Sequence, residues 1–156
     1  MEYFGTIVLI GLIATTYMTL FLYLVHALKI SKTNMLDALG LLFVEDTKKA
    51  RRLGMVIHYF MGVSFAFLYM WAANYIGFST KDDFMNFGIA LGILHGVAFS
   101  SLLVAVVTEH HPLGEYRKHG FAVVLAYGIA HVIYGISIGR TAIWLDPNFE
   151  FLKLFQ

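Results

Sequence analysis

Charged residues are placed along this chain so that four long stretches contain none of them. No Asp, Glu, Lys or Arg occurs in residues 3–28, 53–80, 84–108 or 119–139. Since an α-helix rises about 1.5 Å per residue, about 20 apolar residues cross the hydrocarbon core of a bilayer. The stretches are apolar on all sides, whereas the strands of a membrane β-barrel alternate in polarity. The pattern predicts four transmembrane helices, at about residues 3–28, 53–77, 84–108 and 119–139.

These helices take up most of the 156 residues and leave no room for a separate soluble domain. We therefore expect residues 1–156 to form a single integral membrane domain, an all-α, polytopic four-transmembrane-helix bundle. Composition agrees, because 59% of the residues are hydrophobic, mean hydropathy is +0.72 and only 13% are charged. A typical soluble domain has about 25% charged residues. The numbers exclude a soluble globular domain, a disordered segment and a nucleic-acid-binding protein.

Two segments outside the predicted spans carry further patterns. At about residues 34–44, an amphipathic helix with Thr33 or Asn34 as its cap is expected to lie in the membrane interface. Its apolar stripe consists of Met35, Leu36, Leu39, Leu42 and Phe43. Residues 141–156 are also amphipathic, and we expect this tail to lie on the outer face or to contact a partner.

Positive charge is distributed unevenly between the two sides of the predicted bundle. Eight of the 11 lysines and arginines fall in the connections at residues 29–52 and 109–118. The other side holds Lys81, Arg140 and Lys153. Since basic loops stay in the cytoplasm, the sequence predicts a multi-pass protein of the cytoplasmic (inner) membrane with both termini outside.

Small residues form stripes on the predicted helices. Gly88, Gly92, Gly96 and Ser100 recur every four residues, and Gly54, His58, Gly62 and Ala66 repeat the spacing. Such stripes allow helix backbones to approach closely in a membrane. They predict tight packing of the four helices and indicate no chemistry.

Motifs for covalent or phosphate chemistry are absent from the sequence. No cysteine occurs, which excludes disulfides and cysteine-ligated metal clusters. We find no phosphate-binding Gly-Lys loop, no Gly-x-Ser-x-Gly elbow and no His-Glu-x-x-His. No acid–base pair can be placed, so the sequence does not predict an enzyme.

The histidines are the main candidate functional residues. His95 and His131 lie near the midpoints of the third and fourth predicted spans, and a hairpin would hold them at similar depth. An ionisable residue inside a bilayer is a candidate for function. Its alternative role is a neutral imidazole that hydrogen-bonds between helices.

Three functional interpretations remain open. His95 and His131 are candidate axial ligands of a haem b, with neighbouring glycines making room for the macrocycle. A transition-metal site at the cytoplasmic end is a second interpretation, with candidate ligands His58, His26, Glu109, His110, His111 and His119. The third is a proton or solute path lined by histidines.

Four short motifs carry a resemblance to known proteins. They are Gly11 to Thr16, His58 to Gly62, Gly92 to Gly96, and His131 to Gly139. The chain resembles small four-span prokaryotic integral membrane proteins that belong to families of unknown function. The resemblance implies a four-span fold, draws attention to His58, His95 and His131, and implies no activity.

The sequence leaves two hypotheses for function. The first is a non-catalytic integral membrane subunit or assembly partner of a larger membrane complex, and its sharper version is an electron-transfer complex in which the chain holds a haem b or a metal. The alternative is a small oligomeric transporter or channel-like protein with a histidine-lined path. The expected partners are the lipid bilayer and other membrane subunits or further copies of the chain.

Overall fold

The computed structural model describes residues 2–31, 34–78, 80–111, 114 and 121–155, and within them the chain is all-α, without strands. The elements are α1 (Glu2–Ala27), α2 (Met35–Leu41), α3 (Thr47–Ile76), α4 (Lys81–His110), α5 (Phe121–Leu145) and the 3₁₀ helix η2 (Glu150–Phe155). Helices α1, α3, α4 and α5 are each long and apolar enough to cross a membrane. These findings confirm the all-α class and the four membrane-spanning segments.

The long helices continue past the charged residues that bound the predicted spans. Helix α3 begins at Thr47, where the Asp46 carboxylate accepts a hydrogen bond from the Lys49 backbone N–H at 2.8 Å. Helix α5 extends to Leu145 and includes Arg140. Caps decide where a helix starts, whereas the charge pattern marks only the part that fits inside hydrocarbon.

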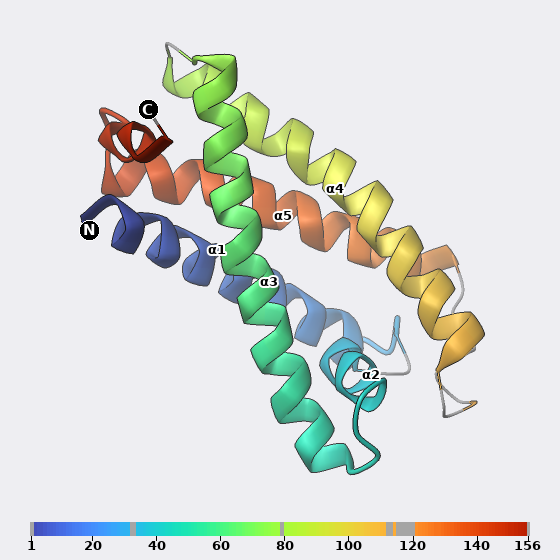
Figure 1. Ribbon diagram of the computed structural model, residues 1–156. Helices are drawn as coiled ribbons and strands as arrows, with labels where there is room; N and C mark the ends of the chain where they lie inside the picture. The colour runs from blue at the N-terminus through green and yellow to red at the C-terminus, as the bar shows by residue number, and fades with distance from the viewer. Residues whose placement is uncertain (1, 32–33, 79, 112–113, 115–120, 156) are drawn as a thin grey trace.

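The four long helices pack one against the next in the order α4, α5, α1 and α3 (Figure 1). Helix α5 packs along α4 on one side and along α1 on the other, while α3 crosses α1 and carries α2 near its start. Helices α3 and α4 are joined by a short connection and spread apart beyond it. The described ends of the chain lie at the same end of the bundle, as an even number of spans requires.

Glycines bring α4 and α5 into backbone contact. A side-chain carbon at Gly92 would lie 2.8 Å from the His131 carbonyl oxygen, and one at Gly96 would lie 2.8 Å from the Gly128 carbonyl oxygen. Distances this short leave no room for a methyl group. The predicted small-residue stripe on α4 therefore packs against α5.

Helix α2 is held against α3 by both packing and charge. A side-chain carbon at Gly54 would collide with the Leu36 carbonyl, and one at Gly40 would collide with the Ala50 carbonyl. The buried Asp37 carboxylate accepts two hydrogen bonds from Arg51, each 2.7 Å long. The predicted short helix is thus present, capped by Asn34, and most of its residues are buried against α3; Thr33 lies outside the described residues.

The segment after α5 folds back onto the bundle. Asp146 ends the helix and accepts a hydrogen bond from the Phe151 backbone N–H at 2.8 Å. Phe151 is fully buried and lies against Phe84 of α4. The segment thus packs against α1 and α3, and its expected position on the outer face of the membrane stays a prediction.

The glycine contacts between α4 and α5 predict an asymmetric response to added methyl groups. We expect Gly96→Ala to lower the free energy of unfolding by about 1–3 kcal/mol, as overpacked cores do. Gly128→Ala, on the facing helix, is the matched control, because its new carbon would meet only Ser100 Oγ at 3.8 Å. We expect Gly128→Ala to leave the free energy of unfolding unchanged or to raise it by up to about 1 kcal/mol, because alanine loses less backbone entropy in a helix than glycine does.

The measurement is unfolding of purified protein in mixed detergent micelles, followed by circular dichroism. Equal losses of stability in the two variants would contradict the packing of α4 on α5 described above.

Candidate functional site

An apolar groove with a volume of about 320 Å³ lies where α3 and α4 spread apart. We call it the histidine groove, because three of the chain's histidines line it. Its lining residues are Thr15, Met18, Met35, Leu39, Ile57, His58, Met61, Gly62, Phe65, His95, Phe99, Leu102, Leu103, Val106, His131 and Tyr134. All four long helices and α2 contribute, and none of the described residues that line the groove is Asp, Glu, Lys or Arg.

Helical spacing explains why these residues share one groove. On α4, the lining residues His95, Phe99, Leu102 and Val106 follow one another at intervals of four, three and four. Residues at these intervals lie on one face of an α-helix. The glycine stripe occupies another face of α4 and packs on α5, so the His95 face is turned toward α3.

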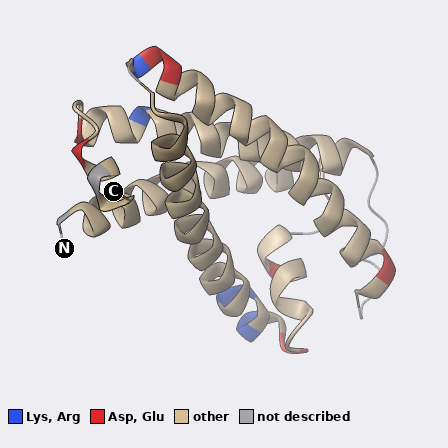
Figure 2. Ribbon diagram, turned by 45° about the horizontal axis from the view of Figure 1, so that its top comes forward, with Lys and Arg blue, Asp and Glu red and all other residues tan. Residues whose placement is uncertain are grey.

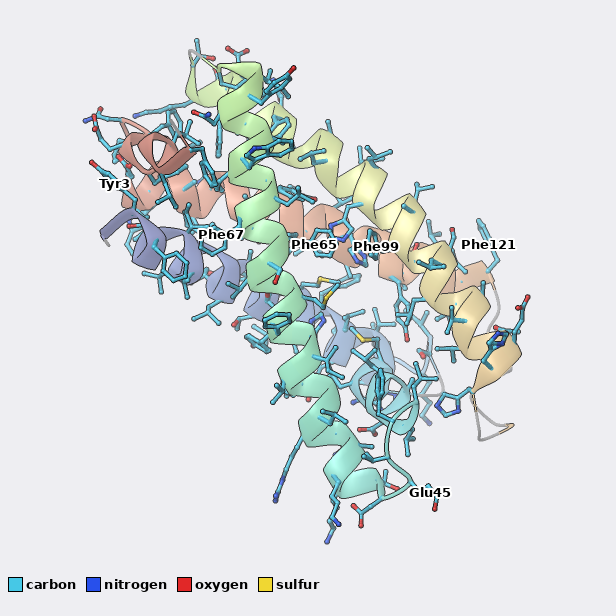
Figure 3. All side chains as sticks on the ribbon, in the orientation of Figure 1. Tyr3, Glu45, Phe65, Phe67, Phe99 and Phe121 are labelled. Atoms are coloured by element: carbon cyan, nitrogen blue, oxygen red, sulfur yellow. The ribbon has the colours of Figure 1, made fainter. Side chains whose placement is uncertain are left out.

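The rings of Phe65 and His95 bound the groove on the side of the connection between α3 and α4. The ring centroid of Phe65 lies 4.1 Å from that of His95 and 4.9 Å from that of Phe99. Figure 3 shows Phe65 on α3 and Phe99 on α4 next to each other. Closer to the connection, the side chains between α3 and α4, such as Tyr69 and Phe84, are buried in the core.

His95 and His131 contact each other directly inside the groove. Their ring centroids are 4.6 Å apart, with the rings meeting edge to face. The Nδ1 atom of His131 lies 2.7 Å from the Tyr127 carbonyl oxygen, and Nδ1 of His95 lies 3.3 Å from the Tyr69 hydroxyl. The sequence-based expectation that the two histidines share a depth agrees with this contact.

His58 lines the same groove from α3 and is held by α1. It is buried, and its Nε2 atom lies 3.1 Å from the Thr19 hydroxyl. The Thr19 hydroxyl in turn donates to the Thr15 carbonyl at 2.7 Å. The groove therefore brings His58 together with His95 and His131, which lie on two other helices.

Gly62 is the point where α1, α3 and α5 meet beside the histidines. The Tyr134 hydroxyl donates a hydrogen bond of 2.6 Å to the Gly62 carbonyl. Any side chain at Gly62 would collide with the Thr15 hydroxyl. These contacts fix the inner wall of the groove.

A haem between His95 and His131 does not fit this arrangement. Axial ligation places the iron and its macrocycle between two imidazoles, and metal–nitrogen distances of about 2 Å would separate the two ligating nitrogens by about 4 Å, with the ring centres farther apart. The centroids are only 4.6 Å apart. Gly92 and Gly96 make no room either, because backbone of α5 occupies the space beside them.

The predicted metal ligands near the start of α3 and the end of α4 are dispersed. His26 is exposed and lies 3.3 Å from the Ser31 carbonyl, Glu109 and His110 are exposed, and His111 is buried. Within the residues that the structure describes, no three His, Asp or Glu side chains are close enough to hold one metal ion. His119 lies outside these residues, so the metal site stays a prediction without support from the described part.

Sequence reasoning missed the partners of the histidines. Tyr69, the partner of His95, lies on α3 and follows His58 by 11 residues, which is close to three helical turns. Spacing alone would therefore have placed Tyr69 on the same face of α3 as His58. Tyr127 precedes His131 by one turn, which also puts its carbonyl within reach. Thr19 could not be found in this way, because it reaches His58 only through the packing of α1 on α3.

The bond between Tyr134 and Gly62 predicts a measurable loss when the hydroxyl is removed. We expect Tyr134→Phe to lower the free energy of unfolding by about 1 kcal/mol, a typical size for hydrogen bonds between membrane helices. Tyr75→Phe is the matched control, because Tyr75 is 83% exposed. Denaturation in mixed micelles measures both variants, and indistinguishable midpoints would contradict a stabilising role for this bond.

Comparison of the chain with protein-family models, with curated proteins and with solved structures found no match. The resemblance carried by the four short motifs therefore stays a hypothesis.

Proposed function

We propose that the chain is a non-catalytic integral membrane protein that holds an apolar molecule with a polar head in the histidine groove. The observation that carries this proposal is the combination of apolar walls with three histidines from three different helices. In this role the chain serves a larger membrane complex as a subunit or assembly partner.

The composition of the groove supports binding over catalysis. Apolar side chains from α2, α3 and α4 offer a surface for a hydrocarbon chain, and a few convergent polar groups fix the orientation of a ligand. Histidine itself can act as a general acid or base, but nucleophilic catalysis also needs a reactive side chain next to that base, and an orienting carboxylate often accompanies it. In the part of the chain that the structure describes, the residues lining the groove include no carboxylate and no lysine.

The arrangement of the helices supports a role within a complex. Helix α4 packs mainly on α5, and its apolar stretch is the least buried of the four long helices. Its outward face is therefore free to contact lipid or another membrane subunit.

We assign the orientation of the protein in the membrane by charge. The start of α3 carries Lys48, Lys49, Arg51 and Arg52, whereas Lys81 and Arg140 lie toward the other end (Figure 2). The positive-inside rule then places the start of α3 in the cytoplasm and both termini outside. A reporter enzyme that works only outside the cytoplasm should be active when it is fused to either terminus. A reporter that works only in the cytoplasm should be inactive at both positions.

The second candidate function is transport along a histidine-lined path. The observation in its favour is that His58, His95 and His131 line one groove. Against it, the groove ends at Phe65 and His95, beyond which Tyr69 and Phe84 are buried in the core. Proton or solute flux into liposomes that is lost in His58→Phe would favour transport over binding.

A matched pair of variants tests the binding proposal. Leu102 lines the groove, whereas Leu94 lies two helical turns earlier on α4, outside the groove, with similar exposure (58% and 65%). We expect Leu102→Trp to fill the groove and to abolish copurification of a lipid-soluble molecule at a fixed ratio to protein. Leu94→Trp should copurify the same molecule as the unmodified chain.

The measurement is gentle detergent extraction followed by native mass spectrometry and by analysis of solvent extracts. Loss of the molecule in both variants, or in neither, would contradict binding in the groove. A Soret absorption band in the purified protein would instead contradict the direct contact of His95 with His131.

A further inference from the structure

We infer that the histidine groove selects an apolar alcohol or phenol, a molecule whose head group donates a hydrogen bond. This inference rests on the proposed binding function and names the chemical class of the ligand. It follows from the number of hydrogen-bond donors and acceptors that the groove presents to a ligand.

The protons at His58 are already assigned by its neighbours. The Thr19 hydroxyl has one proton, and it donates this proton to the Thr15 carbonyl. Thr19 must therefore accept from His58, which places the proton of a neutral imidazole on Nε2. The Nδ1 atom of His58 is left with a lone pair, as a hydrogen-bond acceptor.

His131 reaches the same state with the opposite tautomer. A carbonyl oxygen can only accept, so the contact with the Tyr127 carbonyl places the proton on Nδ1 of His131. Its Nε2 atom is then the acceptor. Among the described residues, the structure shows no hydrogen bond to this nitrogen or to Nδ1 of His58, although both rings line the groove.

The hydroxyl groups around the groove have no proton left to offer. Thr15 donates to the Gly11 carbonyl at 2.7 Å, and Tyr134 donates to the Gly62 carbonyl. His95 and Tyr69 share two protons and use one of them in the contact between them, so in either tautomer of His95 the pair keeps a single donor, against the two acceptor nitrogens of His58 and His131. Acceptors therefore outnumber donors in the groove.

The ligand has to supply the missing donors. A hydroxyl group satisfies one of the histidine lone pairs, whereas an ether, ester or quinone brings only further acceptors and leaves the nitrogens unpaired. Polar groups that stay unpaired in an apolar site weaken binding. A long-chain alcohol, a polyprenol or a hydroquinone has the required combination of hydroxyl and hydrocarbon.

Two probes that differ in one group test the inference. The protein is placed in lipid nanodiscs, and uptake of radiolabelled dodecanol and of dodecyl methyl ether is measured against empty nanodiscs. We expect saturable uptake of dodecanol, about tenfold tighter than that of the ether, the size of one lost hydrogen bond. Uptake that is equal for the two probes, or stronger for the ether, would overturn the inference while leaving binding intact.

Variants locate the selectivity and separate the possible failures. His58→Phe and His131→Phe should each reduce the preference for the alcohol, whereas His26→Phe, an exposed histidine outside the groove, should leave it unchanged. Saturable uptake of neither probe would overturn the binding function itself. A metal ion that copurifies and is lost in both groove variants would overturn the inference, because it would use the same lone pairs.

A measurement on the unmodified chain avoids any failure of a variant to fold. Nitrogen chemical shifts of labelled histidine distinguish the two neutral tautomers. We expect His58 protonated at Nε2 and His131 protonated at Nδ1, and the reverse assignment for either residue would overturn the inference.

Discussion

Glycine allows α4 to lie with its backbone against α5, and this close approach decides where the other helices can go. Gly92 and Gly96 meet carbonyl groups of α5 at distances that exclude any side chain. The small residues of α3 pack against other elements in the same way, since Gly54 contacts α2 and Gly62 contacts Thr15 of α1. Because α3 and α4 each use their small-residue faces elsewhere, they spread apart, and the histidine groove is the space between them.

Much of this fold could be predicted from the sequence because the two governing patterns are local. The absence of charge over a membrane thickness gives the number of spans, and the four-residue glycine spacing identifies the packing faces. The partner of each face is not local. Gly96 meets α5 and Gly62 meets α1, yet both lie in the same kind of stripe. The burial of Phe151 could not be predicted for the same reason, because this side chain is buried only where α1, α3 and α4 converge.

In the candidate site, too, some features follow from local sequence and others need the tertiary structure. Position within the spans was enough to single out His58, His95 and His131, and the groove brings all three together. Their hydrogen-bonding states depend on partners at different distances along the chain. The carbonyl that fixes His131 comes from Tyr127, one turn earlier on the same helix, whereas Thr19 lies 39 residues from His58. The first partner is implied by helical spacing, and the second needs the tertiary structure.

Histidine suits such a groove because its two nitrogens lie on different sides of a rigid ring. One nitrogen can donate to the protein while the other faces the ligand, and the ring stays uncharged in an apolar environment. A serine or threonine on a membrane helix tends to donate its proton to the carbonyl one turn back, as Thr15 and Thr19 do here. The hydroxyls thus stabilise the helices and hold the imidazoles, and the acceptor nitrogens of His58 and His131 remain to distinguish one ligand from another.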